Sequence, residues 1–142
     1  MDLIPTISSH GSTTACWIML DRYEYYNRNP EGLHLQDCVC RAISTAADLR
    51  YEAVDKLLSL VAKEHGCEKL YICCYDNLLE DILGYPRFNC MFQQTVEQVA
   101  AQHPRNKLII RVEGHLTCSI NGAIMDIWDC SRERVDCFWI VP

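Results

Sequence analysis

The sequence lacks the basic excess and the long apolar segments that nucleic-acid-binding and membrane proteins carry. Its 13 Lys and Arg residues are outnumbered by 19 Asp and Glu residues, which gives a formal net charge of −6. Nucleic-acid binding needs a clustered basic face, so this charge argues against such a partner. The longest uninterrupted apolar run near the start, residues 15–20, is far shorter than the roughly 20 residues of a membrane-spanning helix and lacks the basic flank of a signal peptide. We therefore expect a soluble cytoplasmic protein with neither a nucleic-acid nor a membrane partner.

Regular cysteine spacing is also missing, although the chain has ten cysteines. The four cysteines between residues 67 and 90 contain no Cys-x-x-Cys pair, and Cys38-x-Cys40 has no matching second pair. The sequence therefore argues against a zinc site, and we expect no metal and no cofactor. Because the cysteines lie within apolar segments, they are typical of small core residues in a reducing compartment, where at most one would be reactive.

A length of 142 residues suits a single folding unit. We interpret residues 1–18 as a tail or peripheral segment and residues 19–142 as one domain. Apolar residues recur at helical spacing after Asp37, and the period changes to two in the last third of the chain. The predicted elements are helices over 38–46, 51–65 and 95–102, a short extended segment over 70–74, a helical turn over 77–83, and strands over 107–112, 115–120, 123–128 and 135–141. N-terminal helices followed by an antiparallel meander predict an α+β fold.

The segment from residue 114 to residue 129 predicts a β-hairpin closed by Asn121-Gly122. Both central residues of a type I′ turn have positive φ, which Asn and Gly tolerate best. Pairing of Ile120 with Ala123 would gather most of the apolar side chains on one face of the hairpin. That pattern independently supports the register.

The other face of this hairpin carries His115, Asp126 and Trp128. In the predicted register, His115 lies opposite Trp128 and one diagonal step from Asp126, a separation of about 7–8 Å at the backbone. A carboxylate at this position fixes the tautomer of the imidazole, as a general base requires. Asp129 is the alternative partner, because a bulge would bring it to the face of His115.

Cys38 is the candidate nucleophile because it falls at the first position of a predicted helix. The positive end of the helix dipole and its free backbone amides favour thiolate over thiol. Asp37 precedes it and is a suitable N-cap. The backbone amide of Cys38 would also point toward an oxyanion formed there. Arg41, one turn further, is expected to satisfy a carboxylate or a carbonyl group.

The order of Cys38, His115 and Asp126 resembles that of the papain-like cysteine peptidases. In that fold a Cys opens the central helix and meets a His and an Asn or Asp on the following antiparallel sheet. The Asp126-x-Trp128 pair resembles an acidic version of the family's Asn-x-Trp motif, in which the Trp shields the His pair. The motifs Asp-Cys-Val-x-Arg-Ala-Ile, Gly-His and Asp-x-Trp-Asp are also similar to small, largely uncharacterised phage and bacterial proteins of papain-like type. The resemblance implies a helical part with the nucleophile at a helix start, packed on a C-terminal antiparallel sheet.

The chain departs from this family pattern at the oxyanion hole. Papain relatives place a Gln five or six residues before the nucleophile, where this chain has residues 32–34. Gln36 and Asn29 are the nearest amide side chains. Loss of one such donor typically lowers the rate by about 10²–10³.

Two functions from different classes follow from these patterns. The first is a cysteine-dependent hydrolase or acyltransferase that acts on an amide bond of a protein or peptide substrate through Cys38, His115 and Asp126. The second is a catalytically silent papain-like scaffold that binds a host or phage protein. The loops over 23–35 and 77–90 are expected to flank the cleft in either case.

Overall fold

A six-stranded mixed sheet forms the centre of the described chain. The computed structural model describes residues 22–33, 36–90 and 92–142, so the segment predicted as a tail, residues 1–18, lies outside the described residues. In chain order the elements are β1 (Tyr23–Tyr25), α2 (Cys38–Ala47), α3 (Tyr51–His65), α4 (Ile72–Asn77), a π-helical segment η1 (Leu78–Ile82), β2 (Arg87–Asn89), α5 (Val96–Gln102), β3 (Lys107–Val112), β4 (His115–Ile120), β5 (Ala123–Asp126) and β6 (Val135–Val141). The strand order is β1-β5-β4-β3-β6-β2. The α+β class predicted from the sequence is confirmed.

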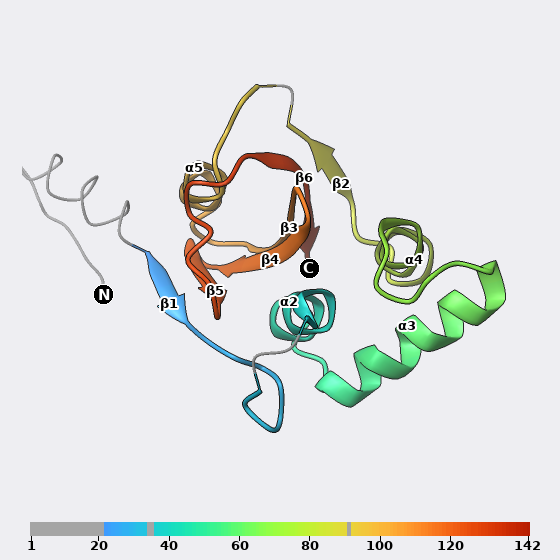
Figure 1. The fold of residues 1–142 in the computed structure, drawn as a ribbon. Helices are drawn as coiled ribbons and strands as arrows, with labels where there is room; N and C mark the ends of the chain where they lie inside the picture. Colours follow the sequence, from blue (N-terminus) through green and yellow to red (C-terminus); the bar gives the residue numbers. More distant parts are fainter. Residues whose placement is uncertain (1–21, 34–35, 91) are drawn as a thin grey trace, which may run out of the picture.

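Helices pack against both faces of this sheet (Figure 1). Helix α2 lies against β4, with α3 and α4 beyond it, and the core between them includes Ile43 and Trp139. A smaller core includes Val99 of α5 and Leu108 of β3. Because successive strand residues alternate between faces, Ile109 belongs to the first core and its neighbour Leu108 to the second.

The predicted hairpin is confirmed at its turn and in the register of the two residue pairs beside it. Asn121 and Gly122 have φ values of 53° and 84°, as a type I′ turn requires. Ile120 pairs with Ala123, and Ser119 pairs with Ile124. The turn therefore fixes which residues of β4 and β5 stand beside one another.

The sheet differs from the predicted meander at three places. β1 pairs in parallel with β5, so the sheet is mixed and not purely antiparallel. The sequence prediction placed residues 23–25 and 87–89 in loops, because each strand has three residues and neither shows a clear apolar alternation. β5 ends at Asp126, two residues earlier than predicted.

The predicted helices over 38–46, 51–65 and 95–102 are confirmed with shifts of at most one residue. The extended segment predicted over 70–74 is wrong, because residues 72–82 form one continuous helical run. Its buried side chains recur at helical spacing: Cys74, Tyr75, Leu78 and Leu79. A five-residue window was too short to show that period. None of the helices within the described ranges is long and apolar enough to cross a membrane.

Candidate active site

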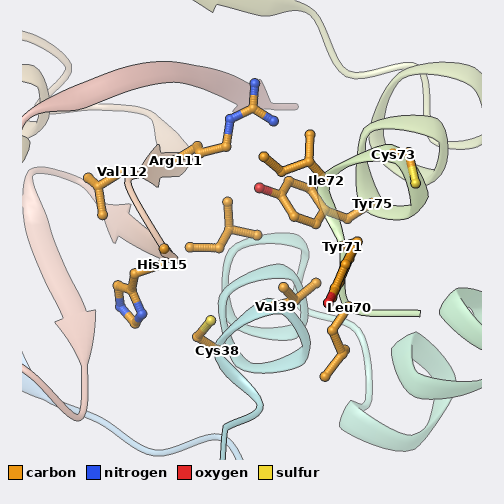
Figure 2. Close-up of a pocket in the computed structure, with 12 residues that line it drawn as sticks. Cys38, Val39, Leu70, Tyr71, Ile72, Cys73, Tyr75, Arg111, Val112 and His115 are labelled. Carbon is orange, nitrogen blue, oxygen red and sulfur yellow. The ribbon is translucent and has the colours of Figure 1, made fainter. Parts of the chain in front are cut away.

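Cys38 is the first residue of α2 and is half-buried beside the start of β4. Figure 2 shows the Cys38 side chain at one end of the cleft, on the same side as the ring of His115. Burial alone would raise the pKa of the Cys38 thiol. Hydrogen bonding to the His115 ring and to the Leu116 backbone amide outweighs burial, so the pKa lies below its ordinary value. Cys40, two residues further along α2, provides a contrast, because burial raises the pKa of its thiol to about 12.

His115 begins β4 and connects the thiol to a carboxylate on β5. Its Nε2 atom lies 2.7 Å from Oδ2 of Asp126, so Nδ1 is the ring nitrogen that this carboxylate leaves available to the thiol. Burial would lower the pKa of His115, but hydrogen bonding to Asp126 and to two neighbouring thiols raises it to about 11. The thiols are Cys130 and Cys38. These shifts favour an imidazolium ion beside a thiolate.

Asp126 is almost fully buried, with 3% of its surface exposed. Burial would raise the pKa of its carboxyl group, but hydrogen bonding and the positive charge of His115 hold the pKa below its usual range. Its Oδ1 atom accepts hydrogen bonds from the backbone N–H of Ile127 at 2.7 Å and from Nη1 of Arg41 at 3.0 Å. Sγ of Cys130 lies 3.8 Å from Oδ2 of Asp126. The sequence patterns did not single out Cys130. The carboxylate therefore has a fixed orientation toward His115.

Trp128 covers the outer side of this pair. Its ring meets the His115 ring edge to face, with the centroids 5.0 Å apart and an interplanar angle of 75°. The other side of Trp128 is exposed. This placement agrees with the shielding position expected for Trp128, and it keeps water from one face of the imidazole.

Asp37 occupies the N-cap position of α2, but its side chain does not cap the helix. The N-cap prediction is wrong in this respect because other partners hold the carboxylate. Nε of Arg41 donates to Oδ1 at 2.6 Å, while Tyr51 and Asn29 donate to Oδ2 at 2.6 Å and 3.0 Å. Only the spacing of four residues between Asp37 and Arg41 is visible in the sequence; no local pattern indicated Tyr51.

The two amide side chains nearest to Cys38 in sequence, Asn29 and Gln36, are not free donors beside the thiol. Asn29 is buried, its amide nitrogen binds Asp37, and its amide oxygen accepts the backbone N–H of Glu31. Gln36 is exposed to solvent. Asp129, the alternative partner of His115, instead accepts hydrogen bonds from the backbone and hydroxyl groups of Ser131. Asp126, not Asp129, is therefore the carboxylate that contacts His115.

A cleft of about 370 Å³ opens beside Cys38 and His115 (Figure 2). Most of its wall is apolar, with Arg111 as the charged exception at the side of β3. The apolar wall residues include Val39, Leu70, Tyr71, Ile72, Tyr75 and Leu116. The prediction that residues 77–90 flank this cleft is wrong, because the start of α4 and the turn before it form that wall.

The donor atoms of His115, Asp126 and Cys130 lie within 4.8 Å of one another, a spacing that a metal ion could use. Two observations favour a hydrogen-bonded pair over a metal site. The His115 and Asp126 atoms are at direct hydrogen-bond distance, 2.7 Å, and the Arg41 guanidinium already neutralises Asp126 at 3.0 Å. A cation so close to the carboxylate opposes the binding of a second cation.

Comparisons of this chain with protein-family models, curated proteins and solved structures found no match. The function is therefore argued from the site itself. The geometry brings together a thiol at a helix start, an imidazole and a buried carboxylate. Such an arrangement can generate a nucleophile and transfer a proton to and from a substrate.

Proposed function

We propose that the protein is a cysteine-dependent hydrolase or acyltransferase of papain-like type that acts on an amide or peptide bond. One observation carries the proposal: the thiol of Cys38 at the start of α2 lies beside His115 at the cleft, and Nε2 of His115 contacts Asp126 at 2.7 Å. Three elements, α2, β4 and β5, supply these residues. The low pKa of the Cys38 thiol and the high pKa of His115 are the shifts that an ion-pair nucleophile needs.

In this proposal the Cys38 thiolate attacks the substrate carbonyl carbon, and the electron pair of the C=O bond moves to oxygen. His115 then donates its proton to the leaving nitrogen as the C–N bond breaks, which leaves an acyl thioester on Cys38. Water, or an amine or alcohol acceptor, attacks the thioester while His115 takes up its proton. The C–S bond then breaks and its electron pair returns to Cys38, which restores the thiolate–imidazolium pair. The products are the amine released in the first step and a carboxylic acid, or an acyl group transferred to the acceptor.

The backbone N–H of Cys38 and the N-terminus of α2 are positioned to stabilise the oxyanion. Neither Asn29 nor Gln36 adds a donor, because Asn29 is bound to Asp37 and Gln36 is exposed. A reaction that relies on fewer donors is slower, typically by about 10²–10³ for each donor lost. We therefore expect a slow enzyme unless the substrate itself completes the oxyanion hole.

The cleft indicates where the substrate would bind. Its apolar wall of Val39, Tyr71 and Ile72 suits an apolar group on the acyl side of the bond, because burial of that group replaces contact with water. The proposed substrate is accordingly a protein or peptide with a large apolar side chain near the bond.

The second candidate is a catalytically silent papain-like scaffold that binds a host or phage protein. The engagement of Asn29 by Asp37 favours it, because this amide is withdrawn from the oxyanion position. The exposed Tyr71 and Ile72 would then belong to a binding surface and not to a substrate cleft. The two candidates differ in one property, the reactivity of Cys38.

Alkylation tests the proposal without knowledge of the substrate. The reduced protein is treated with iodoacetamide at about pH 6, and the labelled cysteines are identified by mass spectrometry. Cys38 should react much faster than Cys40, a buried thiol on the same helix, which serves as the internal control. Uniform slow labelling of the cysteines would contradict the proposed enzyme and favour the catalytically silent scaffold. Fast labelling that disappears in a His115→Gln variant would support the enzyme.

A further inference from the structure

The candidate active site closes on itself through Arg41. From the thiol, contacts run through His115 to Asp126, from Asp126 to Arg41, and from Arg41 to Asp37. Asp37 is the residue directly before Cys38, so the peptide chain completes the ring. When the thiol and imidazole form an ion pair, the charges alternate in sign along the side-chain contacts from Cys38 to Asp37, and the peptide chain joins the two negative ends.

Arg41 is the only member of this ring that contacts two carboxylates. Its Nε atom lies 2.6 Å from Oδ1 of Asp37, and its Nη1 atom lies 3.0 Å from Oδ1 of Asp126. The Arg41 side chain is 7% exposed, so water screens these contacts little. The planar guanidinium presents donors in a fixed geometry, which lets one side chain hold two carboxylates at once.

Without Arg41, Asp37 would lose its cation and Asp126 would lose one of its two, both at buried positions. Asp126 would keep His115 and the Ile127 amide, but the contact that limits rotation of its Oδ1 edge would be gone. Asp37 would keep only the neutral donors Tyr51 and Asn29. Its negative charge would then stand uncompensated next to Cys38 and oppose ionisation of the thiol.

We propose that Arg41 is a positioning residue: its guanidinium fixes the carboxylate that orients His115 and offsets the negative charge beside Cys38. This role rests on the proposed function, because it gives Arg41 an effect on the nucleophile and not on stability alone. It also links the first turn of α2 to β5, so the distance between the thiol and the imidazole depends on one side chain.

The charged and titratable groups around the thiol come from five parts of the chain. They are Asp37 and Arg41 from α2, His115 from β4, Asp126 from β5, Cys130 from the loop after β5, and Tyr51 from α3. Arg41 is the only one of them with a permanent positive charge. A change in the pH dependence of Cys38 alkylation after substitution of Arg41 therefore reports on the guanidinium.

The test is the pH profile of Cys38 alkylation by iodoacetamide in the full chain. Arg41→Met should lower the rate at about pH 6 by about tenfold, which corresponds to a rise of one unit in the thiol pKa, the lower end of the effect of a nearby opposite charge. The rate at about pH 10, where the thiol ionises without help, should stay within about twofold. Arg87→Met is the matched control, since Arg87 pairs with Asp76 and Glu80 away from the site. It should leave the whole profile unchanged.

Arg41→Lys keeps the charge and serves if Arg41→Met does not fold. A single ammonium group reaches one carboxylate well but not two. Alkylation of Cys38 in Arg41→Lys at about pH 6 should therefore be slower than in the wild type. Where Arg41→Met also folds, Arg41→Lys should react faster than Arg41→Met. Wild-type rates in either folded variant would overturn the bridging role. Slow labelling of Cys38 in the wild type itself would instead overturn the proposed function, so the two failures are distinguishable.

Discussion

Nε2 of His115 lies 2.7 Å from Oδ2 of Asp126, across a hairpin whose two-residue turn sets their register. The two residues are 11 positions apart in sequence, and their side chains are in direct hydrogen-bond contact. The imidazole is 13% exposed and the carboxylate 2% exposed at the side-chain level. Much of the chemistry expected of this protein depends on that one contact.

Replacement of Asp126 by Asn should remove the main cause of the high pKa of His115, which would fall from about 11 toward its ordinary value. The imidazole would also lose the carboxylate that fixes its orientation beside the thiol, so alkylation of Cys38 at about pH 6 should slow by at least about tenfold. NMR titration of the His115 ring measures the first effect and mass spectrometry the second. Asp129→Asn is the control, because Asp129 contacts Ser131, and it should change neither.

Stability should depend on pH through the same pair. The folded pKa of His115, about 11, lies above its ordinary value of 6.5, so its contribution is complete below about pH 6.5 and is lost as the pH rises toward 11. The pKa of Asp126 is lowered, so its contribution is present above the unfolded pKa and is lost as the pH falls. Urea unfolding of the wild type and of His115→Gln at about pH 6, 8 and 10 tests this. The difference in unfolding free energy should shrink as the pH rises; a constant difference would contradict the assignment.

The turn residue Gly122 should affect both stability and reactivity. Its φ of 84° is costly for a residue with a side chain, so Gly122→Val should destabilise the protein by about 1–2 kcal/mol and loosen the hairpin register. Alkylation of Cys38 at about pH 6 should slow as a result. Gly66→Val, at a φ of 63° at the end of α3, imposes comparable backbone strain away from the site. It should reduce stability and leave the Cys38 rate unchanged in the folded protein.

The apolar wall of the cleft should discriminate between alkylating reagents by size and polarity. Ile72→Ser should leave the reaction of Cys38 with iodoacetamide unchanged and slow its reaction with a chloroketone that carries a Leu or Phe side chain. Loss of about 1 kcal/mol of apolar burial corresponds to about a fivefold change in rate. Leu60→Ser is the control, since Leu60 is exposed on α3 and does not line the cleft. Equal sensitivity of both variants would mean that the cleft does not receive the reagent.

Local patterns predicted α2, α3 and α5, the hairpin and the helix-start position of Cys38, because each depends on residues close in sequence. The Asn121-Gly122 turn was sufficient to place His115 beside Asp126. The same turn could not indicate Arg41 as the residue that bridges Asp37 and Asp126, since that contact joins α2 to β5.

The remaining features of the site depend on contacts between distant segments. Tyr51 and Asn29 bind Asp37 from α3 and from the loop after β1, and no spacing rule links these positions. The wall at residues 70–75 was missed for a different reason. Helix α4 is short, and its apolar residues show a helical period only when η1 is included. The apolar segment over 70–74 taken alone therefore favoured a strand.

The parallel strand β1 has a consequence for how the protein can be divided. The backbone N–H of Tyr26 donates to the Asp126 carbonyl oxygen at 2.9 Å, and the Tyr23 hydroxyl donates to the same oxygen at 3.0 Å. A fragment that began after Tyr26 would keep Cys38, His115 and Asp126 but not the edge strand that anchors β5. The smallest working unit therefore starts before Tyr23, and transplanting the helix and the hairpin alone into another scaffold would carry the reactive groups without the frame that aligns them.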